Sequence, residues 1–168
     1  AEYLEQAKKQ RRRVAAIMPV HLFGLMADMN PLMELAKEYN LGVVEDAACA
    51  LGSLYNSKHA GTFGDAGCFS LHPRKSITTG EGGVLITSNT EIATSVQRLR
   101  DFGTVISDFD RYEKGDLFLP DYDILGYNYR MTDIQAAIGG EQMKKLPRMI
   151  EKRIEIAEKY GEALGHID

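Results

Sequence analysis

Short apolar runs alternate with amphipathic segments along this chain, and this alternation limits the folds that it can adopt. The runs at 14–20 and 41–45 have the length and near-continuous apolarity of strands buried on both faces. Between them lies a segment with helical spacing, for which Asn30 is the expected N-cap and Asn40 an expected end. Strand, helix and strand in this order predict an α/β fold with a mainly parallel sheet flanked by helices.

The rest of the chain continues this pattern. Further strands are expected at 66–71 and 83–87, and further helices at 2–12, 90–102, 132–146 and from 147 onward. Residues 103–125 are acidic, aromatic and aperiodic, which predicts a long loop. Ligands of such sheets bind beyond the carboxyl ends of the strands, so the candidate site includes His21, Asp46 and residues 70–75.

Charge and cysteine content exclude several classes of protein. With 20 Lys and Arg against 24 Asp and Glu, the formal charge is −4, which argues against a general nucleic-acid binder. The two cysteines, Cys49 and Cys68, form no C-x-x-C pair, and the four histidines lack paired spacing. Neither a disulfide framework nor a metal site is therefore indicated, and a reducing, cytoplasmic location is expected.

The N-terminal region loosely resembles a signal peptide, because basic residues precede the apolar residues 14–27. Pro19 and His21 interrupt that run, which favours a short buried strand followed by a loop. No stretch of the sequence is long enough to span a membrane, so no membrane partner is expected.

Lys75 is the first candidate for chemistry, because it follows an expected buried strand and precedes a glycine-rich turn. A lysine desolvated at such a place is a nucleophile for a carbonyl compound. Most lysines are solvated surface residues, and position alone favours that alternative. Asp46, at the end of an apolar run, is either a helix N-cap or a buried carboxylate that needs a partner such as a pyridinium N–H.

Three further residues have both a structural and a functional interpretation. Ser70 either donates a hydrogen bond to a phosphate or satisfies a backbone carbonyl. Histidines at positions such as His21 and His72 are more often structural than catalytic, although both fall near the expected cleft.

The sequence contains no Walker A motif, no G-x-S-x-G and no H-E-x-x-H.

Five segments, in order along the chain, resemble a known family. They are Pro19-Val-His-Leu-Phe-Gly24, Val44-Glu-Asp-Ala-Ala48, Gly61-Thr-Phe-Gly-Asp65, Phe69 to Gly83, and Leu125-Gly-Tyr-Asn-Tyr-Arg-Met-Thr-Asp133. Together they are similar to the DegT/DnrJ/EryC1/StrS family of pyridoxal-phosphate (PLP) aminotransferases. The resemblance implies the type I fold of aspartate aminotransferase, with one antiparallel strand near 83–88. It also implies that residues 1–131 are the central part of the PLP-binding large domain and that 132–168 are helices leading toward a C-terminal domain.

The resemblance implies four contacts to the cofactor. Lys75 matches the lysine that holds PLP covalently, and Asp46 matches the aspartate that faces the pyridine nitrogen. Ser70 matches the serine that contacts the phosphate. Cys49 stands where the family usually has a glutamine or histidine beside the cofactor's hydroxyl, and a thiol is a weaker hydrogen-bond partner.

A second set of residues is implied near the substrate or a neighbouring subunit. Asn128 matches an asparagine that reaches the phosphate of the neighbouring subunit's cofactor, so a homodimer with shared sites is expected. Arg130 lies in the same loop and, with His21 and His72, is a candidate for contacting substrate or for shaping a loop.

The implied reaction transfers an amino group from an amino acid, with glutamate as the expected donor, to a nucleotide-linked keto-sugar for surface-polysaccharide or antibiotic-sugar synthesis. Lys75 argues against the family's dehydratases, which have a histidine there. Family members are longer, so a phosphate-binding loop before Ala1 and a small domain after about residue 165 are expected outside this chain. The alternative is a truncated, inactive member that serves as a structural or regulatory module.

Overall fold

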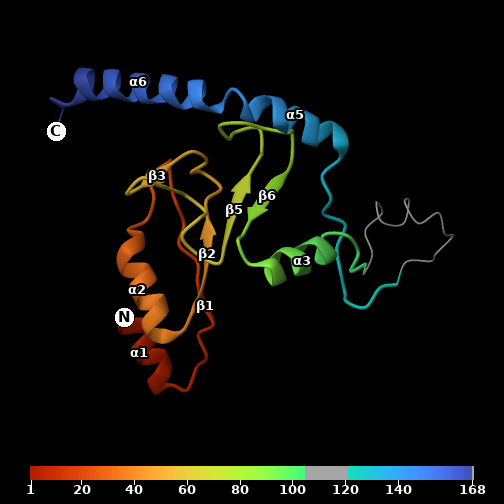
Figure 1. Ribbon diagram of the computed structural model, residues 1–168. Coiled ribbons are helices and arrows are strands. Elements are labelled where there is room, and N and C mark those ends of the chain that lie inside the picture. The colour runs from red at the N-terminus through yellow and green to blue at the C-terminus, as the bar shows by residue number, and fades with distance from the viewer. Residues whose placement is uncertain (105–120, 168) are drawn as a thin grey trace. The chain divides into compact units, whose positions relative to one another are not determined.

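A computed structural model describes residues 1–104 and 121–167 (Figure 1). These residues form two compact units, the first made of Ala1–Ile86 with Asp133–Asp168 and the second of Thr87–Thr132. The division expected at 131/132 concerns the domains of a longer protein and stays a prediction. Most of the loop expected at 103–125 lies outside the described residues.

A four-stranded sheet forms the centre of the first unit, in the order β1-β2-β5-β6 (Figure 1). The strands are β1 (Ala16–Ile17), β2 (Gly42–Asp46), β5 (Ala66–Ser70) and β6 (Gly83–Ile86). β1, β2 and β5 run parallel, whereas β6 runs antiparallel to β5. The expected α/β fold, its mainly parallel sheet and the antiparallel strand near 83–88 are therefore confirmed. β3 (Leu54–Tyr55) and β4 (Lys58–His59) pair with each other in a small hairpin and form a separate two-stranded sheet.

The first strand is shorter and less buried than expected. The apolar run at 14–20 contributes only Ala16–Ile17 to the ladder, and Val20 meets Asp46 as an isolated bridge. Pro19 interrupts the ladder because it has no N–H to donate. Met18 is 66% exposed and Val20 46% exposed, so the expectation of a strand buried on both faces is wrong for the described chain.

The helices of the first unit are α1 (Glu2–Lys9), α2 (Met29–Tyr39), α5 (Asp133–Met143) and α6 (Leu146–Leu164). α2 begins after Asp28, so Asn30 is not its N-cap. The Asp28 carboxylate does not cap the helix, because it accepts a hydrogen bond from the Tyr55 hydroxyl instead. At the other end, Asn40 has a φ of 51°, and this left-handed conformation ends α2 as expected.

The core lies where α2 packs against β2. Its buried members are Met26, Met29, Ala36, Val43, Ala47, Ala50 and Ala60. Backbones also approach closely at Gly67, where a Cβ would lie 2.3 Å from Gly61 Cα. Only glycine fits there, so β5 presses directly against the loop that begins at Gly61. That loop contributes the amides which bind Glu45, described below.

The second unit consists of α3 (Thr90–Leu99) and the segments that follow it. Asn89 caps α3, since its Oδ1 accepts hydrogen bonds from Glu91 N at 2.8 Å and Ile92 N at 3.2 Å. Phe102 has a φ of 57°, and its backbone N–H donates to Tyr127 O at 2.8 Å. The helix expected at 90–102 therefore stops at Leu99, and the chain turns to meet the residues after 121. Among the helices that the structure describes, none is long and apolar enough to cross a membrane.

Candidate active site

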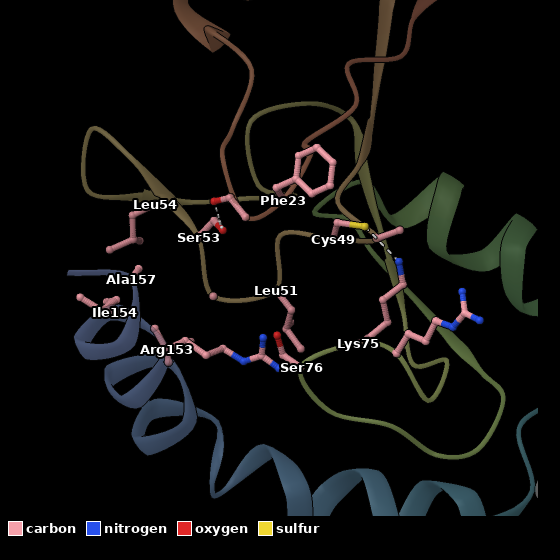
Figure 2. Close-up of a pocket in the computed structure, with 15 residues that line it drawn as sticks. Phe23, Cys49, Leu51, Ser53, Leu54, Lys75, Ser76, Arg153, Ile154 and Ala157 are labelled. Atoms are coloured by element: carbon pink, nitrogen blue, oxygen red, sulfur yellow. Dashed lines mark hydrogen bonds between the residues drawn. The ribbon is translucent and has the colours of Figure 1, made fainter. Parts of the chain in front are cut away.

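A cavity of about 750 Å³ opens beside the carboxyl ends of β2 and β5 in the first unit (Figure 2). Its walls come from the turn at 23–24, the turns at 48–54, the segment 74–76 and one face of α6. A volume in this range is typical of pockets for small ligands. The cavity therefore provides a space next to the sheet edge where the sequence predicts a site.

Lys75 lines the cavity and is half-buried. Its ammonium Nζ lies 3.0 Å from the Sγ of Cys49, to which it donates a hydrogen bond (Figure 2). Its backbone N–H donates to His72 O at 2.9 Å, which fixes the turn after β5. Two elements distant in sequence thus bring an amine and a thiol together, and Lys75 is not the fully solvated surface lysine of the alternative interpretation.

Helix α5 holds the other side of the Lys75 loop. Thr78 N donates to Gln142 Oε1 at 3.1 Å, and the Thr78 hydroxyl donates to Leu71 O at 2.8 Å. Gln142 was not a candidate in the sequence, because an amide in an amphipathic helix gives no motif. Its contact with residue 78 becomes visible only when α5 is placed against the loop.

Asp46 and Ser70 lie at the carboxyl ends of neighbouring parallel strands, with Asp46 opposite Cys68. Asp46 Oδ1 accepts a hydrogen bond from Ala48 N at 3.1 Å, so it caps a turn, and no helix follows for it to N-cap. No hydrogen bond to Asp46 Oδ2 is found within the described parts of the chain. Ser70 Oγ accepts a hydrogen bond from His72 N at 3.3 Å.

The negative charge of Asp46 acts on the thiol of Cys68. Burial raises the pKa of Cys68, and the nearby negative charge of Asp46 raises it further. Cys68 is thus held as a thiol within β5, whereas Cys49 is exposed at the cavity. The two cysteines therefore differ in their accessibility to ligands and reagents.

Glu45, for which the sequence predicts no role, is completely buried beside Asp46. Successive strand residues point to opposite faces, so Glu45 points away from the face that Asp46 occupies. Its Oε1 accepts from Phe63 N at 2.6 Å and Gly64 N at 2.8 Å, and its Oε2 accepts from Gly61 N at 2.8 Å. Glu45 therefore anchors the loop at 61–64. The one available signal was an acidic residue inside an apolar strand.

His21 completes the set of hydrogen bonds to Glu45. It is 0% exposed, and its Nε2 lies 3.0 Å from Glu45 Oε2. The Ala27 N–H donates to His21 Nδ1 at 3.3 Å, which assigns the proton of a neutral imidazole to Nε2. The sequence leaves two roles open for His21, contact with a substrate and the shaping of a loop. Its buried position against Glu45 favours the second.

The hydrogen bonds to Glu45 predict a loss of stability in acid. Burial alone would raise the pKa of Glu45, but hydrogen bonds from His21 and the Gly64, Gly61 and Phe63 amides outweigh burial and lower the pKa below 4.5. The ionised carboxylate therefore contributes stability that is complete above pH 4.5 and is lost as the pH falls through the lower folded pKa.

We expect the free energy of unfolding, measured with denaturant between pH 7 and pH 3, to fall below about pH 4.5. A Glu45→Gln variant should show a shallower acid slope because it has no carboxyl group to protonate. Equal slopes in both proteins would contradict this assignment.

The remaining candidates lie in other surroundings. His72 Nδ1 accepts from Arg74 N at 3.2 Å, and its Nε2 is 3.8 Å from Glu81 Oε1. In the second unit, Asn128 bridges Asp101 by backbone pairing, and Arg130 Nε lies 3.2 Å from Asp101 Oδ1. The first unit thus brings Lys75, Cys49, Asp46 and Ser70 to one sheet edge, while Asn128 and Arg130 belong to the second.

The model of the DegT/DnrJ/EryC1/StrS aminotransferase family matches residues 2–168. The chain belongs to this family. GDP-perosamine synthase of Caulobacter vibrioides is 40% identical over 155 residues, which cover 92% of this chain and 39% of that protein. The structure of Helicobacter pylori PseC, an aminotransferase involved in the biosynthesis of pseudoaminic acid, superposes with a TM-score of 0.84 at 32% identity, covering 92% of this chain and 40% of that one.

PLP is the cofactor of this family. The Escherichia coli GDP-4-keto-6-deoxy-D-mannose-3-dehydratase, solved with bound hydrated PLP, superposes with a TM-score of 0.80 at 30% identity, covering 96% of this chain and 44% of that one. The chain spans about two fifths of the length of the relatives it matches.

Proposed function

We propose that a protein carrying this sequence transfers an amino group from an amino acid, with glutamate as donor, to a nucleotide-linked keto-sugar. The observation that carries this proposal is Lys75, whose Nζ faces a cavity at the carboxyl ends of two parallel strands. Family relatives named GDP-perosamine synthase and UDP-4-amino-4,6-dideoxy-N-acetyl-beta-L-altrosamine transaminase support the substrate class.

The described residues fit PLP. Lys75 offers an amine at the cavity, and Asp46 Oδ2 is open to accept a hydrogen bond from a pyridinium N–H. Ser70, at the end of the next strand, offers a hydroxyl for the phosphate, and Cys49, hydrogen-bonded to Lys75, is the residue proposed to contact the ring hydroxyl. PLP, when bound, supplies an electron sink for cleavage of the bond between carbon and hydrogen.

Lys75 and Asp46 have separate tasks in this proposal. The Asp46 carboxylate holds a proton at the pyridine nitrogen by its charge. Lys75 Nζ removes a proton from the carbon that bears the donor's amino group. Later it delivers a proton to the sugar carbon that receives the amino group. Cys49 accepts a hydrogen bond from Lys75 Nζ and so limits where that amine rests.

Asn128 is proposed to act across a subunit interface. It lies in the second unit, where the stacked rings of Tyr127 and Tyr129, with centroids 5.0 Å apart, stiffen the segment around it. In a two-fold homodimer, the same segment of each subunit would approach the other subunit's site. We place this dimer in the cytoplasm, in polysaccharide or antibiotic-sugar synthesis.

Borohydride trapping tests the proposed role of Lys75. Reduction of the PLP-loaded, full-length protein should fix the cofactor covalently on the lysine that holds it, and peptide mapping should find the label on Lys75. Lys58, exposed and only 4.4 Å from the Phe63 ring centroid, is an internal comparison on the same unit. A label on Lys58 or another lysine would refute the assignment of Lys75, and no label at all would favour the inactive structural module.

A further inference from the structure

The cavity that contains Lys75 is lined by three cationic side chains from two elements. Arg74 and Lys75 lie on the loop after β5, and Arg153 comes from α6. Among the described residues that line the cavity, there is no Asp or Glu. Such a lining attracts an anion, and Lys75 is already assigned to the cofactor in the proposed function.

Arg153 has no ion-pair partner within the described ranges. Its neighbours on the helix at i±3 and i±4 are Met149, Ile150, Ile156 and Ala157, so no carboxylate can reach it along α6. The adjacent Lys152, in contrast, pairs with Glu155. Among the residues that the structure describes, no carboxylate therefore neutralises the charge of Arg153.

Arg153 also extends across the cavity. Figure 2 shows its guanidinium reaching from α6 toward Ser76 and Leu51, while Lys75 approaches from the loop after β5. Apolar side chains of α6, Ile150 and Ile154, flank it in the lining. Ile150 brings α6 close to this wall, since a Cβ at Gly52 would lie 2.2 Å from Ile150 Cδ1.

We infer that Arg153 binds the diphosphate of the nucleotide-linked sugar and so sets how far the sugar reaches toward Lys75. This inference rests on the proposed function. A guanidinium forms paired hydrogen bonds with phosphate oxygens, and the apolar flank suits the face of a sugar or base. A cavity of about 750 Å³ holds more than an amino-acid donor, and Lys75 and Arg153 contribute from different walls, as a long ligand requires.

The test measures binding of GDP and UDP to the PLP-loaded, full-length protein by calorimetry. Arg153→Gln should weaken binding roughly 10- to 100-fold, since a hydrogen-bonded charge is lost, and Arg153→Lys should weaken it less. Arg148→Gln is the matched control, because Arg148 lies on the same helix beside Glu151 and Glu155 and outside this cavity. It should bind GDP and UDP as the unaltered protein does.

A second measurement separates the diphosphate from the donor carboxylate. Conversion of the cofactor spectrum by glutamate alone should proceed at the same rate in Arg153→Gln as in the unaltered protein. Unchanged binding of GDP and UDP by Arg153→Gln would overturn the inference. If conversion by glutamate were also slowed, Arg153 would be assigned to the donor instead. If the unaltered protein shows no conversion and no borohydride label on Lys75, the proposed function itself fails.

Discussion

Replacing Lys75 by alanine is expected to abolish amino transfer while leaving the fold intact. The substitution removes the amine that is proposed to move the proton, and loss of such a group lowers rates by roughly 10²- to 10⁴-fold. Loss of the covalent hold on the cofactor adds to that effect. Lys75 is half-buried at the edge of a cavity, so truncating it leaves no hole in the core. The measurement is turnover of glutamate with a nucleotide-linked keto-sugar by the full-length protein.

Lys58→Ala is the matched control for this loss. Lys58 is exposed on the same unit, and its contact with the face of Phe63 is worth about 0.5–1 kcal/mol at an exposed site. Turnover by Lys58→Ala should equal that of the unaltered protein. Retention of turnover in Lys75→Ala, with the protein folded by circular dichroism, would refute the assignment.

The largest expected loss of stability comes from Glu45→Gln. The side chain keeps its size, but one carboxylate oxygen becomes an NH₂ group that faces the donors of Gly61 and His21 or those of Phe63 and Gly64. Two buried donors then lose their acceptor and meet another donor. Breaking a buried charged network in this way costs about 3–5 kcal/mol of unfolding free energy. Denaturant titration at pH 7 measures it.

Glu34→Gln provides the comparison, because Glu34 lies exposed on α2. Surface substitutions of this kind change stability by about 0.5 kcal/mol or less. If Glu45→Gln unfolds at the same denaturant concentration as Glu34→Gln, Glu45 does not anchor the loop at 61–64.

Local signals predicted much of the sheet and helices correctly. β2, β5 and the end of α2 at Asn40 follow from apolar runs and from a residue that tolerates positive φ. The expected N-cap Asn30 was wrong, since α2 begins after Asp28, whose carboxylate accepts a hydrogen bond from the Tyr55 hydroxyl, 27 residues away. A hydroxyl at that distance in sequence leaves no local pattern.

The sequence likewise predicts some residues of the candidate site and misses others. Asp46 and Ser70 end strands and Lys75 follows one, so the rule that ligands bind beyond strand ends selected them as candidates. Glu45 and Arg153 escaped that rule for a different reason. Three of the partners of Glu45 are backbone amides, which every sequence has, and the distinguishing feature of Arg153 is its place in the lining of the cavity that contains Lys75. Such properties depend on packing and appear only in three dimensions.

The side-by-side placement of Glu45 and Asp46 restricts which changes the strand can tolerate. Glu45 anchors a loop on one face of β2, and Asp46, on the other face, is the residue proposed to hold the cofactor's pyridine nitrogen. Inserting or deleting a single residue in β2 would exchange the two faces and disable both tasks at once. A substitution in β2 changes one side chain, whereas a change in its length displaces every side chain that follows. Hybrids with related proteins must therefore be joined outside residues 42–46.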